Sequence, residues 1–228
     1  MLAITGNVPT SQFNRAPFQE TGRHFQAEFP NVMRPYVKKA FQPTRVEMLP
    51  VTLRQAFKTM LTGRPGPVGI DVPLNCFAEE AEVEVPEPGL WRKGIRTGGS
   101  GTTESAEQAL EMLLSAEKPC ILAGNGAMIS EAGKEIQKLS KLLGIPVATT
   151  ANGKGIIPED NPLSLGGIGR NGTYMANESC RSCEVLLAVG AKFDDRQSSS
   201  WIPGYSFNIP PTQLIHVDID PEELGRNY

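Results

Sequence analysis

The strongest constraint on the fold is a series of short, largely apolar segments in the second half of the chain. They are residues 120–123, 146–150, 185–189 and 214–217. Strands that are apolar on both faces are typical of a parallel sheet that helices cover on both sides. The segments between them supply such helices, because leucine, isoleucine and alanine recur there at helical spacing. The second half therefore predicts an α/β fold with a doubly wound parallel sheet.

The first half carries the same kind of pattern over a shorter length. Residues 2–5 and 68–72 are expected to form buried strands, and residues 36–41 a short one. Residues 46–61 are expected to form a helix, because proline suits its first turn and apolar residues then fall on one face. A core strand that starts at residue 2 predicts that the chain begins part-way through a domain. A helix expected from Pro221 onwards predicts that it also ends inside one.

The composition changes between the two halves. Residues 78–102 are rich in glutamate, proline and glycine, as in E-E-A-E-V-E-V-P-E-P-G and T-G-G-S-G. Such a stretch is typical of a surface linker between domains, and loops of this length are uncommon inside one compact domain. We therefore expect one partial domain at residues 1–77, a linker at 78–102, and a second domain at 103–228.

The charge pattern excludes two classes of partner. The net charge is −3, and lysine and arginine do not cluster as a nucleic-acid-binding surface requires. No apolar run is long enough to span a membrane, and the N-terminus lacks the features of a secretory signal. The sequence thus predicts a cytoplasmic location with no nucleic-acid or membrane partner.

The four cysteines are interpreted as reduced thiols, since no signal peptide points to an oxidising compartment. Cys180 and Cys183 form a C-x-x-C pair. A zinc site would need two further ligands, and the only histidines, His24 and His216, are distant in sequence. A redox pair would need a different topology, because this pair precedes a strand. We interpret both residues as small side chains on a helix beside the core, and no metal ligand is assigned.

Ligands of open α/β sheets bind beyond the carboxyl ends of the strands. Four loops follow the predicted strands of the second half, at residues 124–126, 150–153, 190–193 and 218–220, and three of them contain glycine. Glycine lets a backbone approach a ligand closely and offers its N–H group to phosphate. Together the loops favour a nucleotide-like ligand. Tight turns are the alternative for the glycines, and a helix cap is the alternative for Asp220.

Several motifs carry a family resemblance. In the first half they are A-I-T-G-N-V-P at residues 3–9, F-Q-E at 18–20 and G-R-P-G-P-V-G-I-D-V-P at 63–73. In the second half they are G-A-K-F-D-D-R at 190–196 and H-V-D-I-D-P at 216–221. In order and spacing they resemble thiamine-diphosphate-dependent enzymes of the acetolactate synthase type. The resemblance implies that residues 1–77 are the end of a pyrimidine-binding domain and residues 103–228 a Rossmann-like central domain.

The resemblance implies roles for three residues. Gln19 resembles a glutamine that hydrogen-bonds near the reactive end of the cofactor, with an ordinary loop glutamine as the alternative. Lys38 resembles a lysine at the substrate entrance, although Lys39 beside it leaves the register open. Arg196 resembles the arginine that receives the second 2-keto acid. A surface ion pair with either of the two preceding aspartates is the alternative for Arg196.

The resemblance also implies cofactors and assembly. Thiamine diphosphate and Mg²⁺ would serve a homodimer or homotetramer that acts on a 2-keto acid. The family's activating glutamate and its G-D-G…N motif match nothing here, so we expect the isolated chain to be inactive. Some relatives carry FAD on the central domain, and others carry ADP or nothing. The matching positions for FAD are Gly124, Asn125, Gly126, Thr150, Gly190, Lys192, Asp194 and Asp218.

Three alternatives stay open on the sequence. The chain could belong to a sister enzyme of the glyoxylate carboligase, sulfoacetaldehyde acetyltransferase or oxalyl-CoA decarboxylase type. It could instead be a non-catalytic module that binds FAD or another nucleotide. A purely structural fragment without a ligand is the third possibility, and exposed strand edges would then make it prone to aggregation.

Overall fold

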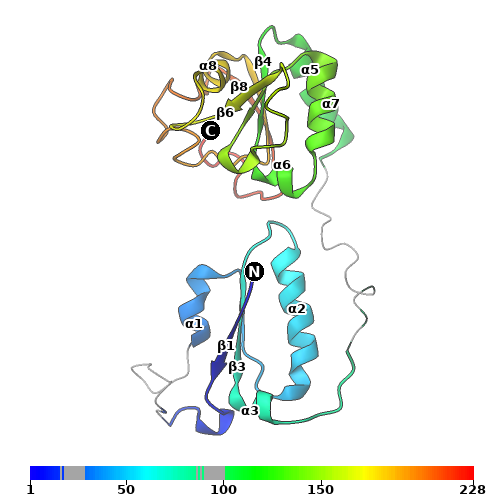
Figure 1. The fold of residues 1–228 in the computed structure, drawn as a ribbon, viewed down its shortest axis with the longest axis vertical. Helices are drawn as coiled ribbons and strands as arrows, with labels where there is room; N and C mark the ends of the chain where they lie inside the picture. The colour runs from blue at the N-terminus through cyan, green and yellow to red at the C-terminus, as the bar shows by residue number, and fades with distance from the viewer. Residues whose placement is uncertain (16, 18–28, 86, 88, 90–100) are drawn as a thin grey trace. The chain divides into compact units, whose positions relative to one another are not determined.

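The computed structural model describes residues 1–15, 17, 29–85, 87, 89 and 101–228. The chain divides into two compact units, Met1–Gly98 and Gly99–Tyr228, and the division lies within the glycine-rich end of residues 78–102. Both units contain a parallel sheet with flanking helices (Figure 1). The predicted α/β class is therefore confirmed. No helix among the described residues is long and apolar enough to cross a bilayer.

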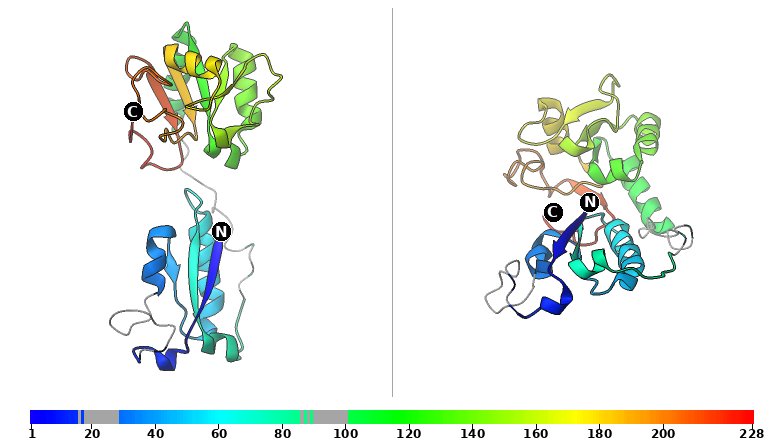
Figure 2. Two further views of the ribbon diagram at one scale, coloured as in Figure 1. Left: turned by 60° about the vertical axis from the view of Figure 1, so that its left-hand side comes forward. Right: turned by 60° about the horizontal axis from the view of Figure 1, so that its bottom comes forward.

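The first unit holds a three-stranded parallel sheet in the order β1-β3-β2. Its strands are β1 (Leu2–Asn7), β2 (Ala40–Phe41) and β3 (Val68–Pro73). Its α-helices are α1 (Phe29–Met33), α2 (Leu49–Leu61) and α3 (Leu74–Ala78), and α1 and α2 lie on opposite sides of the sheet (Figures 1 and 2). Single 3-10 turns occupy Thr10–Gln12, Arg34–Tyr36 and Val46–Met48.

Two elements of the first unit are shorter than the sequence predicts. The strand expected at residues 36–41 pairs only over Ala40–Phe41, because Pro35 lies in a 3-10 turn just before it. The helix expected from residue 46 becomes α-helical only at Leu49, after a 3-10 turn, and Pro50 then fits its first turn as expected. The core of this unit is formed by buried Ala56, Val68, Ile70, Val72 and Cys76.

The second unit holds a five-stranded parallel sheet in the order β6-β5-β4-β7-β8. Its strands are β4 (Pro119–Ala123), β5 (Val147–Thr149), β6 (Ser164–Gly167), β7 (Val185–Val189) and β8 (Gln213–Val217). Its helices are α5 (Thr103–Ser115), α6 (Asn125–Ile129), α7 (Gly133–Leu143) and α8 (Tyr174–Ser182), with a 3-10 turn at Ala151–Gly153.

The central strand β4 shows why this unit is doubly wound. Ile121 faces one apolar cluster, which also contains residues of α5 and α7, whereas Cys120 and Leu122 face a second cluster under α8. The helices accordingly cover both faces of the sheet (Figure 1). Side chains of a strand alternate between faces, so burial on both sides requires the uninterrupted apolar run seen in the sequence.

Two features of the second unit differ from the prediction. Strand β6 lies within residues 152–172, which read as a glycine-rich loop, because Ser164–Gly167 contains no β-branched or aromatic residue. The helix expected from Pro221 is absent, and residues 221–225 form turns. Asp220 still caps the start of these turns, since its carboxylate accepts a hydrogen bond from the Glu222 N–H group at 3.1 Å.

All four cysteines are buried and reduced. The Sγ atoms of Cys120 and Cys180 lie 3.8 Å apart in the core under α8. Hydrogen bonding to Cys120 and burial raise the pKa of Cys180 well above its ordinary value, and burial raises the pKa of Cys183 to about 12. The thiols of Cys180 and Cys183 therefore stay protonated at neutral pH and unreactive. The C-x-x-C pair packs as two small side chains, as predicted.

Candidate functional site

The candidate site of the second unit is the carboxyl edge of its sheet, where the loops after β4 and β7 meet. These strands are neighbours at the centre of the sheet, and the chain leaves them in opposite directions. The Gly124 N–H group donates to Val189 O at 2.9 Å, and the Gly126 N–H group donates to Gly190 O at 3.0 Å. The two loops are therefore held together by their backbones at the point where an open α/β sheet binds its ligand.

Glycine is required here by the close approach of the loops to each other. A Cβ atom at Gly124 would lie 2.1 Å from Gly190 O, and one at Gly126 would lie 2.7 Å from Gly190 Cα. These contacts account for the glycines without a ligand. The N–H groups of Gly124 and Gly126 are also occupied, so neither is available to a phosphate group.

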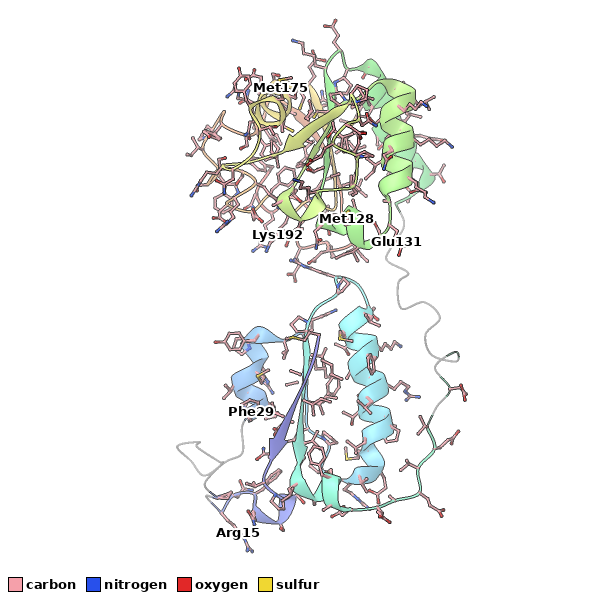
Figure 3. All side chains as sticks on the ribbon, viewed as in Figure 1. Arg15, Phe29, Met128, Glu131, Met175 and Lys192 are labelled. Carbon is pink, nitrogen blue, oxygen red and sulfur yellow. The ribbon has the colours of Figure 1, made fainter. Side chains whose placement is uncertain are left out.

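Other residues assigned to a nucleotide are engaged within the fold as well. Thr150 Oγ1 accepts from the Gly153 N–H group at 3.1 Å, and Asp218 Oδ1 accepts from the Asp220 N–H group at 2.9 Å. Asn125 and Lys192 are exposed. Lys192 lies at the same end of the unit as Met128 in α6, whereas Met175 of α8 lies apart from them (Figure 3). Of the assigned residues, Asn125 and Lys192 thus remain the most accessible to a ligand.

The loop that follows β7 is anchored by Phe193. This residue has a positive φ of 53°, and its ring is buried. The ring makes edge-on contacts with Phe207, His216 and Tyr228, at centroid separations of 5.1, 5.3 and 5.3 Å. The Trp201 indole N–H also donates to Phe193 O at 3.1 Å. An aromatic anchor under the F-D-D-R motif fixes the backbone from which Arg196 projects.

Asp194 stabilises the same loop. Its Oδ1 atom accepts hydrogen bonds from the N–H groups of Arg196 and Gln197, at 3.0 and 2.9 Å. Arg196 is exposed, and within the described part of the chain its guanidinium forms no ion pair with either neighbouring aspartate. The positive charge of Arg196 is therefore available to an anionic ligand.

No site residue was predicted in the loop after β6, which packs against the Arg196 loop. The Arg170 N–H group donates to Arg196 O at 3.1 Å. The side chain of Asn177 in α8 holds the neighbouring Gly169. Asn177 Oδ1 accepts from the Gly169 N–H group at 3.1 Å, and Asn177 Nδ2 donates to Gly169 O at 3.0 Å. The sequence signal that could have pointed to Arg170 is an arginine within a glycine-rich loop. It did not place Arg170 at the sheet edge, because β6, the strand before this loop, was not predicted.

In the first unit, polar side chains converge on Asp71 at the carboxyl ends of the strands. The buried Asp71 carboxylate accepts hydrogen bonds from Thr5 Oγ1 at 2.9 Å, Asn7 Nδ2 at 2.6 Å and Gln42 Nε2 at 2.8 Å. Asn7 Oδ1 in turn accepts from the Val8 N–H group at 2.8 Å. This network joins the ends of β1 and β3 to the residue that follows β2, and it fixes the start of the loop after β1.

Lys38 lies away from this network, before the start of β2. Its Nζ atom donates to Thr62 O at 2.7 Å and to Arg64 O at 2.9 Å. Lys38 therefore holds the turn after α2, at the amino end of the sheet. Gln19 lies outside the described residues. The structure thus does not bring Lys38 into the polar network around Asp71.

Asp71→Asn should lower the free energy of unfolding of the first unit by about 1–3 kcal/mol, because an amide NH₂ group would face donors that now share a carboxylate. Urea unfolding of the chain, followed by far-UV circular dichroism, measures the change. Glu79→Gln is the matched control, since Glu79 is an exposed carboxylate of the same unit. Equal stability of the two variants would contradict a structural role for the Asp71 network.

The described residues contain no group of three or more histidine, cysteine, aspartate or glutamate side chains that could hold a metal ion. At the carboxyl edge of the second sheet, Lys192 and Arg196 are exposed cationic side chains.

Comparison with known proteins gives a consistent family. A model of the thiamine pyrophosphate enzyme central domain matches residues 106–228. All of the chain is similar to a "Probable acetolactate synthase large subunit" of Methanocaldococcus jannaschii, at 38% identity, and covers 37% of that protein. The "Acetolactate synthase" of Arthrospira platensis is 36% identical over 100% of this chain, which covers 38% of the relative.

A third relative, the "Acetolactate synthase large subunit" of Corynebacterium glutamicum, is 32% identical over 99% of this chain. The chain covers 34% of that protein. It thus spans between 34% and 38% of the length of these three relatives. The similarity extends across both units, although the family model covers only the second.

Proposed function

Because the chain belongs to the thiamine-diphosphate-dependent, acetolactate synthase-like family, we propose that it is part of an enzyme that decarboxylates one 2-keto acid and joins the product to a second. Such an enzyme acts as a lyase or transferase. Thiamine diphosphate, when bound, supplies the nucleophilic carbon that this chemistry requires. The contribution of this chain is to orient the second substrate.

One observation carries the proposal. Arg196 is exposed at the carboxyl edge of the second sheet, on a loop fixed by Phe193 and Asp194, and it forms no ion pair in the described part of the chain. A guanidinium can hold a carboxylate through two parallel hydrogen bonds. A 2-keto acid carries such a carboxylate beside its reacting carbonyl, so Arg196 would orient that carbonyl for attack.

The remaining features of the whole enzyme are also proposals. Mg²⁺ and the diphosphate would be held by the family's G-D-G…N motif, which matches nothing in these 228 residues. FAD would have to rely on Asn125 and Lys192, since Gly124, Gly126, Gly190, Thr150, Asp194 and Asp218 make hydrogen bonds within the fold. The whole enzyme would be a homodimer or homotetramer in the cytoplasm. Gln19 would lie near the cofactor, and Lys38 would lie at the substrate entrance.

The function can be tested with a hybrid enzyme, in which this chain replaces the matching segment of the Arthrospira platensis relative. With pyruvate, thiamine diphosphate and Mg²⁺, the hybrid should form acetolactate. The isolated 228-residue chain should form none above a blank without protein, because the family's activating glutamate and its G-D-G…N motif match nothing in it. A hybrid that folds and binds thiamine diphosphate but forms no acetolactate would contradict the proposed function, and turnover by the isolated chain would contradict its inactivity.

A further inference from the structure

Two exposed arginines are carried by stretches of backbone that are bonded to each other. The Arg170 backbone N–H group donates to Arg196 O at 3.1 Å, although two strands, β5 and β4, lie between β6 and β7, the strands that precede these residues. At Gly169, with a φ of 97°, a Cβ atom would lie 2.2 Å from Arg196 O. The loop after β6 therefore reaches across the carboxyl edge and packs tightly against the loop that carries Arg196.

The Arg170 guanidinium is held by a residue of the second loop. Its Nη2 atom donates to Ser200 Oγ at 2.5 Å. Ser199, Ser200 and Trp201 all have positive φ values, of 51°, 59° and 53°. Non-glycine residues in this region cost about 1–2 kcal/mol each, and strain of this kind clusters at functional sites. The strained turn places the hydroxyl that restrains Arg170.

Among the described residues, the two arginines of this edge have no carboxylate partner. Lys192 adds a third exposed cation. Of the two carboxylates on the same loop, Asp194 already accepts N–H groups of the backbone, and Asp195 is exposed. The edge therefore offers two guanidinium groups, one of them held by a neutral hydroxyl.

We propose that Arg170 is a specificity-determining residue that selects a carbonyl substrate with two anionic groups. Arg196 would receive the carboxylate beside the carbonyl, and Arg170 the second anionic group of the same molecule. This inference rests on the proposed function and deepens it, because a single arginine suffices for a substrate with one carboxylate. Two arginines on loops joined by a backbone hydrogen bond can each contact one anionic group of the same substrate.

Direct binding to the 228-residue chain tests the inference without any chemistry. The probes are 2-oxoglutarate, which has two carboxylates, and 2-oxobutyrate, which has one, at constant ionic strength. Binding is followed by NMR through the backbone N–H signals of Gly169 and Arg196. We expect 2-oxoglutarate to bind about 10-fold more tightly, which corresponds to one additional charge-assisted contact. Arg170→Met should reduce the two affinities to the same value.

Two further variants make the result specific. Arg170→Lys keeps the charge but loses the planar fork, so it should retain only part of the preference. Lys138→Met removes one positive charge from the exposed face of α7 and should leave the preference unchanged. Equal binding of the two probes, no binding of 2-oxoglutarate, or the same loss of preference in Lys138→Met would overturn the inference.

The outcome is distinguishable from a failure of the proposed function. If the hybrid enzyme forms no acetolactate but the preference for 2-oxoglutarate depends on Arg170, the arginine pair binds dianions and the proposed carboligation is wrong. If the hybrid is active and the preference is absent, the carboligation stands and the role of Arg170 is wrong.

Discussion

Gly124→Ala should lower the free energy of unfolding of the second unit by about 3–4 kcal/mol, near the upper end of single-residue effects. The added Cβ would lie 2.1 Å from Gly190 O and 2.7 Å from Ala191 Cα. Both are backbone atoms next to the central strand β7, so neither can move aside as a flexible side chain could. The loops after β4 and β7 would have to separate, with loss of the hydrogen bond from Gly126 to Gly190.

Two glycines of the same chain serve as controls. Gly144→Ala tests backbone conformation alone, because Gly144 has a φ of 68° but open space around its Cβ position, and about 1–2 kcal/mol is expected. Gly101→Ala should change neither backbone strain nor packing, since Gly101 has no positive φ and no neighbour within 4 Å of its Cβ position. Urea unfolding measures all three. A Gly124→Ala variant as stable as Gly144→Ala would show that the loops separate at little cost.

The sequence was most informative where a strand is buried on both faces. Residues 185–189 were predicted with the bounds that β7 has, because five consecutive apolar residues fit a strand covered on both sides. β6 was not predicted, because its Ser-Leu-Gly-Gly sequence has the composition of a loop. The order of the strands could not be predicted from the pattern either, since it depends on contacts between distant segments.

For the candidate site, the sequence predicted that the loops after β4 and β7 lie at one edge of the sheet, but not what their glycines do there. The rule that ligands bind at the carboxyl edge placed the loops after β4 and β7 together, and the structure has them in contact. Their glycines serve the contact between the loops, a role that depends on the distance between two backbones. Arg170 was missed for a similar reason, because its hydrogen bond to Arg196 joins loops that lie far apart in the sequence.

Arg196→Lys in the hybrid enzyme should cost about 2–4 kcal/mol of transition-state stabilisation for the joining step, equivalent to roughly 30- to 1,000-fold in rate. Lysine keeps the positive charge but cannot form two parallel hydrogen bonds to a carboxylate. The second 2-keto acid would then bind in several orientations, and few of them present its carbonyl for attack. Release of CO₂ from the first keto acid should be largely spared, since that step does not use the second carboxylate.

Measuring CO₂ release and acetolactate formation separately distinguishes this role from a structural one. Arg181→Lys is the matched control, because Arg181 belongs to the same unit but forms an ion pair with Glu178 on α8. It should leave the ratio of the two rates unchanged. A general loosening of the loop by Arg196→Lys would lower both steps together and would lower the unfolding temperature. If both rates fall equally, or neither falls, Arg196 does not orient the second substrate, and the observation that carries the proposed function loses its meaning.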